Sequence, residues 1–411
     1  MTDETTQSVE TPYGWIVVAA SLLLMATAFG ASYLMIVGLK PVAAEFGWPR
    51  WVPSLAYSLI LLGAGFGGIV MGRWSDRSGM GGPALLGGFM VGGGAIALSY
   101  MDGIWPLLLL SGLVIGFLGN GTVFSPLLTN ATRWFDRRRG IAVAIVACGQ
   151  SLAGAAWPTL FRYGIDEIGW RQTWFYYGIF AICVMVPLSL LLRRRPPAYR
   201  SIASAQAAAA ATRSVALPPG VVQVLLCVAI VGCCVAMAMP MVHVVAYCSD
   251  LGFEAARGAE MLSLLLACAF FSRLGFGWLS DRIGGLMTIL LGSAMQAVTL
   301  AMYIWIDNLI GLYIISGLFG LVFGGIVPAY ALAVRELFPE SEAGWRIGVV
   351  FLFGTVGMAL GGWLGGWVFD LTGTYQIAFM TGVFFNLINL MVIGALIWQE
   401  GAATRAQAAS A

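Results

Sequence analysis

Apolar residues are grouped along the chain in runs of about twenty, and polar residues are concentrated in the short segments between these runs. A helix of that length crosses the ~30 Å hydrocarbon core of a bilayer. The pattern predicts spans at 13–39, 51–74, 83–101, 105–133, 140–161 and 170–192, and a second set at 220–248, 256–279, 284–305, 308–334, 346–369 and 374–398. We therefore expect an all-α polytopic membrane protein with 12 transmembrane helices.

The two sets of six spans are separated by a segment rich in Arg, Pro, Ser and Ala. The expected organisation is an N-terminal tail, a six-helix half, a linker, a second six-helix half and a C-terminal tail, at 1–12, 13–192, 193–219, 220–398 and 399–411. Of the 21 Lys and Arg residues, 15 fall on the side of the termini and the linker, and five fall on the other side. The positive-inside rule therefore predicts that both termini and the linker are cytoplasmic, in a cell inner (plasma) membrane.

Composition narrows the class of function. Hydrophobic residues make up 60% of the chain and charged residues 10%, whereas soluble proteins carry about a quarter charged residues. A formal net charge of +2 offers no basic face for nucleic acid. The seven cysteines form no CxxC pair and no Cys/His cluster, so neither a metal nor a cofactor is expected. We expect a monomer in contact with membrane lipid.

Arg273 is the only charge in the apolar run 261–279. Eight residues of helix separate it from Asp281, roughly 12 Å, which is near half of a hydrocarbon core. A charge at this depth costs several kcal/mol unless it faces a protein interior or a water-filled cavity. Snorkelling does not reach far enough, and the run 261–279 contains no acidic residue to pair with it. The pattern favours a binding site for a small organic anion over a structural role.

The chain contains an internal repeat. The motif Gly-Arg-Trp-Ser-Asp-Arg-Ser-Gly at 72–79 recurs as Gly-Trp-Leu-Ser-Asp-Arg-Ile-Gly at 277–284, after an offset of 205 residues. Each half carries one copy after its second span. Parallel repeats of six helices are typical of secondary transporters.

At this motif the chain resembles the major facilitator superfamily. The segments RWFDRRRGIAVAIVACGQSLAG at 133–154 and SYLMIVGLKP at 32–41, with the spacing from Arg273 to the second motif, are similar to the monocarboxylate porters and the oxalate:formate antiporters. The resemblance implies that Arg273 pairs with a substrate carboxylate and that Tyr33 lines the cavity. It also implies that the motif loops gate the transporter through Asp76, Arg77, Asp281 and Arg282. The alternative for these four residues is a role as topology anchors.

Two departures from this family bear on the substrate. Gly354 stands where the dicarboxylate-exchanging relatives have a second cation, a lysine. Ala269 and Tyr33 stand where the animal porters have an aspartate and a lysine. A site with one cation balances one carboxylate, which favours a monocarboxylate. The missing aspartate leaves the usual proton carrier unidentified.

His243 is the only histidine, and its side chain is the one best suited to proton exchange near neutral pH. The alternative is a neutral imidazole that donates a hydrogen bond to a neighbouring helix. Asn120 and Gln150 are polar groups near mid-depth that could bind a substrate hydroxyl or carbonyl, or could join helices at about 1 kcal/mol each. Aromatic candidates for the walls of a substrate site, with packing as the alternative, are Phe124, Phe323 and Tyr330.

Several residues are expected to have packing roles. Gly357, Gly361 and Gly365 recur at four-residue spacing in span 11, which lets helix backbones approach closely. Asn386 and Asn389 in span 12 are expected to be structural. Pro240 in span 7 and Pro328 in span 10 interrupt hydrogen-bond ladders and are candidate flex points.

The function predicted from sequence is a secondary active transporter of a small organic monocarboxylate, similar to lactate or pyruvate, coupled to protons. The alternatives are a carboxylate anion exchanger and a transporter of neutral drug-like solutes with a structural Arg273. A receptor with this fold is disfavoured because the sequence contains no soluble output domain. The sequence does not predict an enzyme, since it has no Ser/His/Asp set, no HExxH motif and no paired intramembrane carboxylates.

Overall fold

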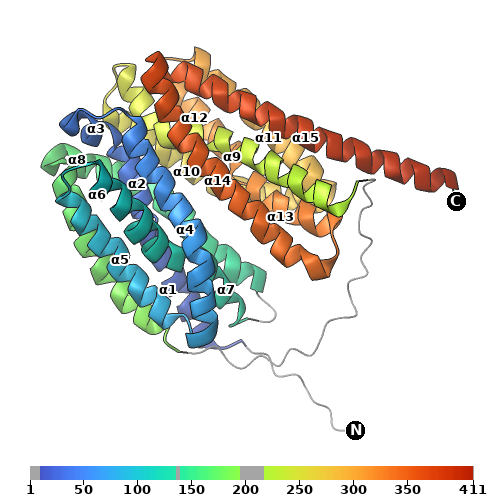
Figure 1. The fold of residues 1–411 in the computed structure, drawn as a ribbon, viewed down its shortest axis with the longest axis horizontal. Coiled ribbons are helices and arrows are strands. Elements are labelled where there is room, and N and C mark those ends of the chain that lie inside the picture. The colour runs from blue at the N-terminus through green and yellow to red at the C-terminus, as the bar shows by residue number, and fades with distance from the viewer. Residues whose placement is uncertain (1–9, 136–138, 195–216, 411) are drawn as a thin grey trace, which may run out of the picture. The chain divides into compact units, whose positions relative to one another are not determined.

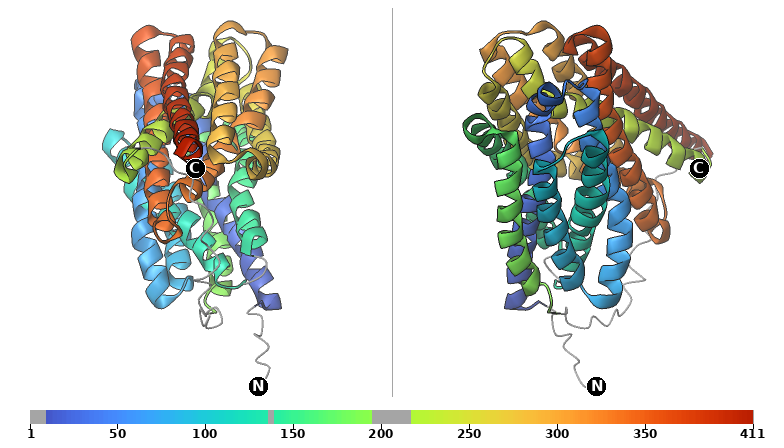
Figure 2. Two further views of the ribbon diagram at one scale, coloured as in Figure 1. Left: turned by 90° about the vertical axis from the view of Figure 1, so that its right-hand side faces the viewer. Right: turned by 60° about the vertical axis from the view of Figure 1, so that its left-hand side comes forward.

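The computed structural model describes residues 10–135, 139–194 and 217–410, and every element in these ranges is a helix (Figures 1 and 2). The first part of the chain forms α1 (Pro12–Ala28), α2 (Gly30–Val37), α3 (Leu39–Phe46), α4 (Trp51–Ser78), α5 (Gly81–Ser99), α6 (Ile104–Leu109), the π-helix η1 (Leu110–Gly119), the 3-10 turn η2 (Asn120–Thr122), α7 (Phe124–Thr132) and α8 (Arg139–Leu191). The second part forms α9 (Pro219–Asp250), α10 (Ala255–Ile283), α11 (Gly285–Trp305), α12 (Leu309–Phe323), α13 (Ile326–Leu337), α14 (Glu340–Thr372) and α15 (Tyr375–Ser410).

The described residues contain 11 stretches long and apolar enough to cross a membrane. One of them, Ile141–Leu191, is 51 residues long and contains Gly169, whose φ of 80° turns the chain between two helices. It therefore holds two of the predicted spans, and the predicted fold class, an all-helical protein of 12 membrane helices, is confirmed. The apolar stretches begin and end within a few residues of the expected positions, and α15 continues beyond the last expected span to Ser410.

The chain forms two compact units, one of residues 1–38 and 59–202 and one of residues 39–58 and 203–411. In the first unit α8 packs against α1 and α5, and η1 packs against α5. In the second unit α9 packs against α14 and α15, and α10 packs against α12. Residues 39–58 belong to the second unit, although the segments before and after them belong to the first. The helix α4 therefore begins in the second unit and continues into the first.

Three spans are interrupted. Span 1 is interrupted at Phe29, between α1 and α2, span 4 passes from a π-helix through a 3-10 turn into α7, and span 10 divides at Gly324–Gly325. Pro126 and Pro328 are each the third residue of the helix that follows an interruption. Proline has no N–H and clashes with the carbonyl of the preceding turn, so it is tolerated in the first turn of a helix and not in its interior. By contrast, α9 continues through Pro240.

The glycines of span 11 allow close helix packing in the second unit, as predicted. A methyl group at Gly357 would lie 2.8 Å from the carbonyl oxygen of Val231, and one at Gly361 would lie 2.5 Å from the carbonyl oxygen of Val235. Side chains larger than hydrogen would therefore push α14 away from α9.

The structural role expected for Asn386 and Asn389 is also observed. The amide of Asn386 donates to the carbonyl oxygen of Ser293 at 2.8 Å, and that of Asn389 donates to the hydroxyl of Ser293 at 2.7 Å. These buried hydrogen bonds tie α15 to α11.

Candidate functional site

Arg273 lies in the middle of α10, on the side of that helix that meets the interruption in span 10. Ala269 and Phe276, one turn before and one turn after Arg273, share its face of the helix. A methyl group at Gly324 would lie 2.9 Å from the Cα of Ala269, and Gly325 packs against the side chain of Phe276. Arg273 itself is half-buried. The cationic side chain of Arg273 therefore lies on the face of α10 that packs against the interruption of span 10. Non-helical backbone within a membrane is tolerated where it is buried in protein or lines a cavity.

The aromatic candidates of the second unit are packed inside it. Phe323 is the last residue of α12, directly before the interruption, and its ring centroid lies 5.4 Å from that of Phe319. Tyr330 is completely buried, and its hydroxyl donates a hydrogen bond to Oδ1 of Asn389 at 2.8 Å. Their predicted role as walls of a substrate site stays a prediction, with packing contacts now identified for both.

His243 is completely buried in α9. Its Nε2 lies 2.9 Å from the carbonyl oxygen of Gly362, and the ring packs against Gly365. A carbonyl oxygen only accepts, so Nε2 carries the proton and Nδ1 is the free acceptor of the neutral ring. Within the described residues Nδ1 has no hydrogen-bond partner. The contact with Gly362 fits the structural alternative for His243, and proton coupling stays a prediction.

The candidates of the first unit gather where spans 1 and 4 are interrupted. Asn120 begins the 3-10 turn of span 4, is 3% exposed, and donates from Nδ2 to the hydroxyl of Ser32 over 3.4 Å. Tyr33 follows Ser32 in α2 and is buried. Phe124 is the first residue of α7, and its ring centroid lies 6.2 Å from that of Phe29, the residue between α1 and α2.

Gln150 lies elsewhere in the first unit, on α8, where it is half-buried. The structure therefore brings three of the four first-unit candidates to one place.

The two copies of the repeated motif end in the same backbone conformation. Gly79 and Gly284 have φ of 89° and 83°, a left-handed region that favours glycine. The guanidinium of Arg282 lies 4.0 Å from the ring centroid of Trp278, and Arg77 is exposed. The side chains of Asp76 and Asp281 lie outside the described part of the structure, so the gating role of these four residues stays a prediction.

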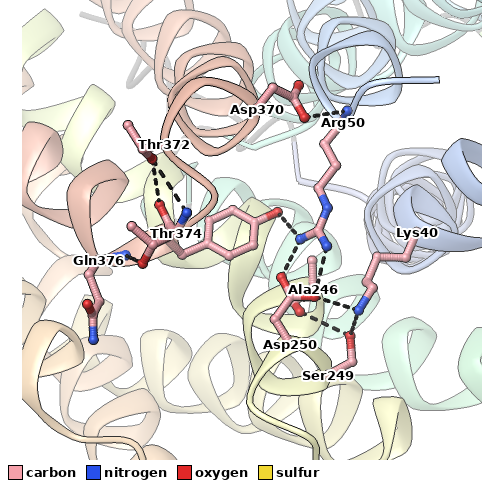
Figure 3. Close-up of polar contacts among 10 residues, drawn as sticks. Lys40, Arg50, Ala246, Ser249, Asp250, Asp370, Thr372, Thr374 and Gln376 are labelled. Carbon is pink, nitrogen blue, oxygen red and sulfur yellow. Dashed lines mark hydrogen bonds and ion pairs between the residues drawn. The ribbon is translucent and has the colours of Figure 1, made fainter.

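A further cluster of polar side chains, the Arg50 cluster, was not predicted from sequence (Figure 3). It consists of Lys40, Arg50, Ser249, Asp250 and Tyr375, all in the second unit. The guanidinium of Arg50 donates to both carboxylate oxygens of Asp250 and, at 3.1 Å, to the hydroxyl of Tyr375. Lys40 donates to Asp250 at 2.7 Å and to Ser249 at 2.6 Å. Two cations therefore share one carboxylate.

The same cluster fixes the beginning of α4. Asp370, near the end of α14, accepts hydrogen bonds from the backbone N–H groups of Arg50 and Trp51 at 3.0 and 2.7 Å. It thus satisfies N–H groups that the first turn of a helix leaves unpaired. The Arg50 guanidinium also lies 3.8 Å from the ring centroid of Phe369.

The charge state of Arg50 follows from these contacts. Burial by itself lowers the pKa of the guanidinium, but the hydrogen bond to Asp250 and the neighbouring Tyr375 outweigh burial and raise the pKa above its usual value. Arg50 is therefore a permanent cation. From the sequence, Lys40 and Arg50 bear only on the membrane topology, as two of the five basic residues on the non-cytoplasmic side. The sequence contained one signal for this cluster. Asp250 follows predicted span 7, on the same side of the membrane as Lys40 and Arg50, where basic residues are few.

Comparisons with known proteins agree with this architecture. Residues 20–344 and 225–411 match the model of the Major Facilitator Superfamily. Monocarboxylate transporter 13 of Bos taurus is 24% identical over 388 residues, which cover 93% of this chain and 88% of the relative. The MFS-type transporter pynF of Aspergillus niger is 25% identical over 354 residues, covering 84% and 78%. The crystal structure of the nucleoside transporter NupG superposes with a TM-score of 0.74 at 11% identity, covering 93% of this chain and 99% of that one.

Proposed function

Because the chain belongs to the Major Facilitator Superfamily, a family of transporters and not of enzymes, we propose that it moves a small organic monocarboxylate across a membrane by alternating access. The proposed substrate has the size of lactate or pyruvate. The membrane is the cell inner membrane, and both termini are cytoplasmic.

The observation that carries this proposal is the position of Arg273. Arg273 lies within span 8, on the helix face that meets the interrupted backbone of span 10. A guanidinium binds a carboxylate through two parallel N–H···O bonds, which fix both position and orientation. Interrupted helices near the middle of the membrane are where transporters of related design hold their substrates.

The preference for one carboxylate rests on Gly354. This residue lies in α14, and a methyl group there would be 3.0 Å from the Cδ1 atom of Ile230 and 3.5 Å from the sulfur of Cys234. Its surroundings are thus apolar, with no second cation at that position. Several relatives are named monocarboxylate transporters, which agrees with a single-carboxylate substrate.

Coupling to protons is the part of the proposal that depends on His243. Its Nδ1 is a buried acceptor with no partner among the described residues, so it could take up a proton. The alternative is anion exchange, with His243 acting only through its hydrogen bond to Gly362. In that case a counter-anion balances the substrate charge and no side chain of span 7 needs to titrate.

The Arg50 cluster is proposed as a lock on the non-cytoplasmic side. Helix α4 continues without interruption from Trp51 to Ser78, yet its first residues are bound in the second unit while the rest belongs to the first. We expect the contacts of Arg50 to hold the beginning of α4 to α9 and α15 in one state and to break in the other. Alternating access requires contacts of this kind, which form in one state and break in the other.

Transport by the purified full-length protein in proteoliposomes tests the proposal. Vesicles preloaded with unlabelled lactate should accumulate radiolabelled lactate by counterflow, and short monocarboxylates should compete, whereas oxalate and neutral solutes should not. Uptake of neutral solutes with no competition by any carboxylate would favour the alternative in which Arg273 is structural.

A further inference from the structure

The side chains that meet in the Arg50 cluster carry more positive than negative charge. Arg50 binds both carboxylate oxygens of Asp250, and Lys40 binds the same carboxylate at 2.7 Å. The carboxylate of Asp370 accepts hydrogen bonds from the backbone N–H groups of Arg50 and Trp51 at the beginning of α4. Two cationic side chains therefore converge on one carboxylate, and all of these residues belong to the second unit.

The two cations are partly exposed and have hydrogen-bond donors in reserve. The exposed fraction is 34% for the side chain of Lys40, 17% for that of Arg50 and 24% for that of Asp250. A guanidinium has five N–H donors and an ammonium has three. Among the described residues, Arg50 uses three of its donors and Lys40 uses two. Both side chains can therefore bind a further acceptor that arrives from solvent.

The cluster already shows how it holds a carboxylate. Figure 3 shows Lys40 and Arg50 pointing toward Asp250 from separate segments of the chain. A guanidinium fork beside a second cation is an arrangement that proteins use to bind carboxylates. The side chain of Asp250 and a small organic acid present the same carboxylate group. If one carboxylate is added, two cations face two anions, so that Arg50 can pair with one anion while Lys40 keeps the other.

We propose that the Arg50 cluster is a recruiting site for the carboxylate of the substrate, which takes the guanidinium fork of Arg50 while Asp250 stays with Lys40. The inference rests on the proposed function and adds the event that opens the proposed lock. Arg50 directly precedes α4, and Asp250 is the last residue of α9. The exchange of partners therefore releases the beginning of α4 from α9 when substrate is present. A ligand shifts a conformational equilibrium toward the state that binds it better, so substrate favours the open state.

Two variants that break the same contact with opposite changes of charge test this inference. Asp250→Asn leaves both cations without their carboxylate, whereas Arg50→Gln leaves Lys40 paired with Asp250. Initial rates of radiolabelled lactate uptake into intact cells that produce the full-length protein give the KM at the outer face. This KM should be about tenfold higher in Arg50→Gln than in Asp250→Asn, because only the second variant keeps the fork available. A lock that does not bind substrate loses the same contact in both variants and should give equal KM values.

The pair Arg257–Glu260 is the matched control. It lies near the beginning of α10, on the same predicted side of the membrane, with side chains exposed at 47% and 37%. Arg257→Gln and Glu260→Gln make the same two changes of charge at a place with no surplus cation. Their KM values should agree within about twofold, because salt screens exposed charges. This comparison separates a site for the carboxylate from a general attraction of anions to the surface.

A third variant keeps the Arg50–Asp250 contact and removes the surplus cation. Lys40→Gln should raise the KM at the outer face about threefold and leave the KM in everted membrane vesicles, which present the opposite face, unchanged. An unchanged outer KM in Lys40→Gln would overturn the inference even if Asp250→Asn does not fold. Equal KM values in Arg50→Gln and Asp250→Asn would overturn it as well. If cells with the wild-type protein take up neither lactate nor another short monocarboxylate, the proposed function itself is wrong.

Discussion

The guanidinium of Arg50 donates two hydrogen bonds to the carboxylate of Asp250, although the two residues are 200 positions apart (Figure 3). The pair is only partly exposed, at 17% and 24% of the two side chains, and Lys40 binds the same carboxylate. Both residues belong to the second unit, and Arg50 directly precedes α4.

This pair should be worth more than an ordinary surface ion pair. We expect a double-mutant cycle with Arg50→Gln and Asp250→Asn to give a coupling free energy of about 1–3 kcal/mol, between the values for exposed and buried pairs. The measurement is the free energy of unfolding in detergent. The exposed pair Arg257–Glu260, at 47% and 37%, serves as the control and should give a smaller coupling, because solvent screens it. Equal coupling in the two cycles would show that the Arg50 cluster is not a lock.

Gly354→Lys should shift preference from monocarboxylates toward a dicarboxylate such as oxalate, because it restores the second cation of the exchanging relatives. The new side chain must displace Ile230, which lies 3.0 Å from the position of its Cβ, so some loss of stability is expected. Gly354→Met controls for size without charge. The ratio of oxalate to lactate uptake should rise in the lysine variant alone. If the wild-type protein already takes oxalate as readily as lactate, the single-cation argument is wrong.

His243→Gln separates the two roles of the histidine. The glutamine amide can still donate to the carbonyl oxygen of Gly362, as Nε2 does at 2.9 Å, but it does not bind a proton near neutral pH. If His243 carries the proton, the variant should retain counterflow and lose accumulation driven by an imposed pH difference. Full accumulation against a gradient by this variant would show that His243 is structural and that the proton carrier lies elsewhere.

Hydropathy was sufficient to predict the fold, because a helix that crosses a bilayer needs about twenty apolar residues and the chain has few other apolar stretches. Hydropathy did not predict where the membrane helices are interrupted. Pro240 and Pro328 have the same local signal, yet α9 continues through the first while span 10 divides before the second. Gly324 and Gly325 lie four and three residues before Pro328 and leave room for the neighbouring helix, which the pattern of a single span does not reveal.

For a similar reason, the sequence predicted only part of the candidate site. Arg273 stands out because a charge in an apolar run is rare, and Asn120 because amides there are uncommon. Hydropathy does not specify which neighbours a side chain meets, so the hydrogen bonds of Tyr330 with Asn389 and of His243 with Gly362 could not be predicted. The Arg50 cluster joins residues from α3, from the position before α4, from the end of α9 and from the beginning of α15, and no local sequence pattern connects them.

The central claim is that Arg273 binds the carboxylate of the substrate, and binding of lactate to purified variants tests it most directly. Arg273→Lys keeps the charge but loses the planar fork, so affinity should fall about tenfold or more, and Arg273→Ala should abolish both binding and uptake. Arg257→Ala, which removes an exposed arginine near the beginning of the same helix, controls for the loss of a cation and should leave lactate binding unchanged. Lactate binding and uptake at wild-type levels by Arg273→Ala would contradict the account.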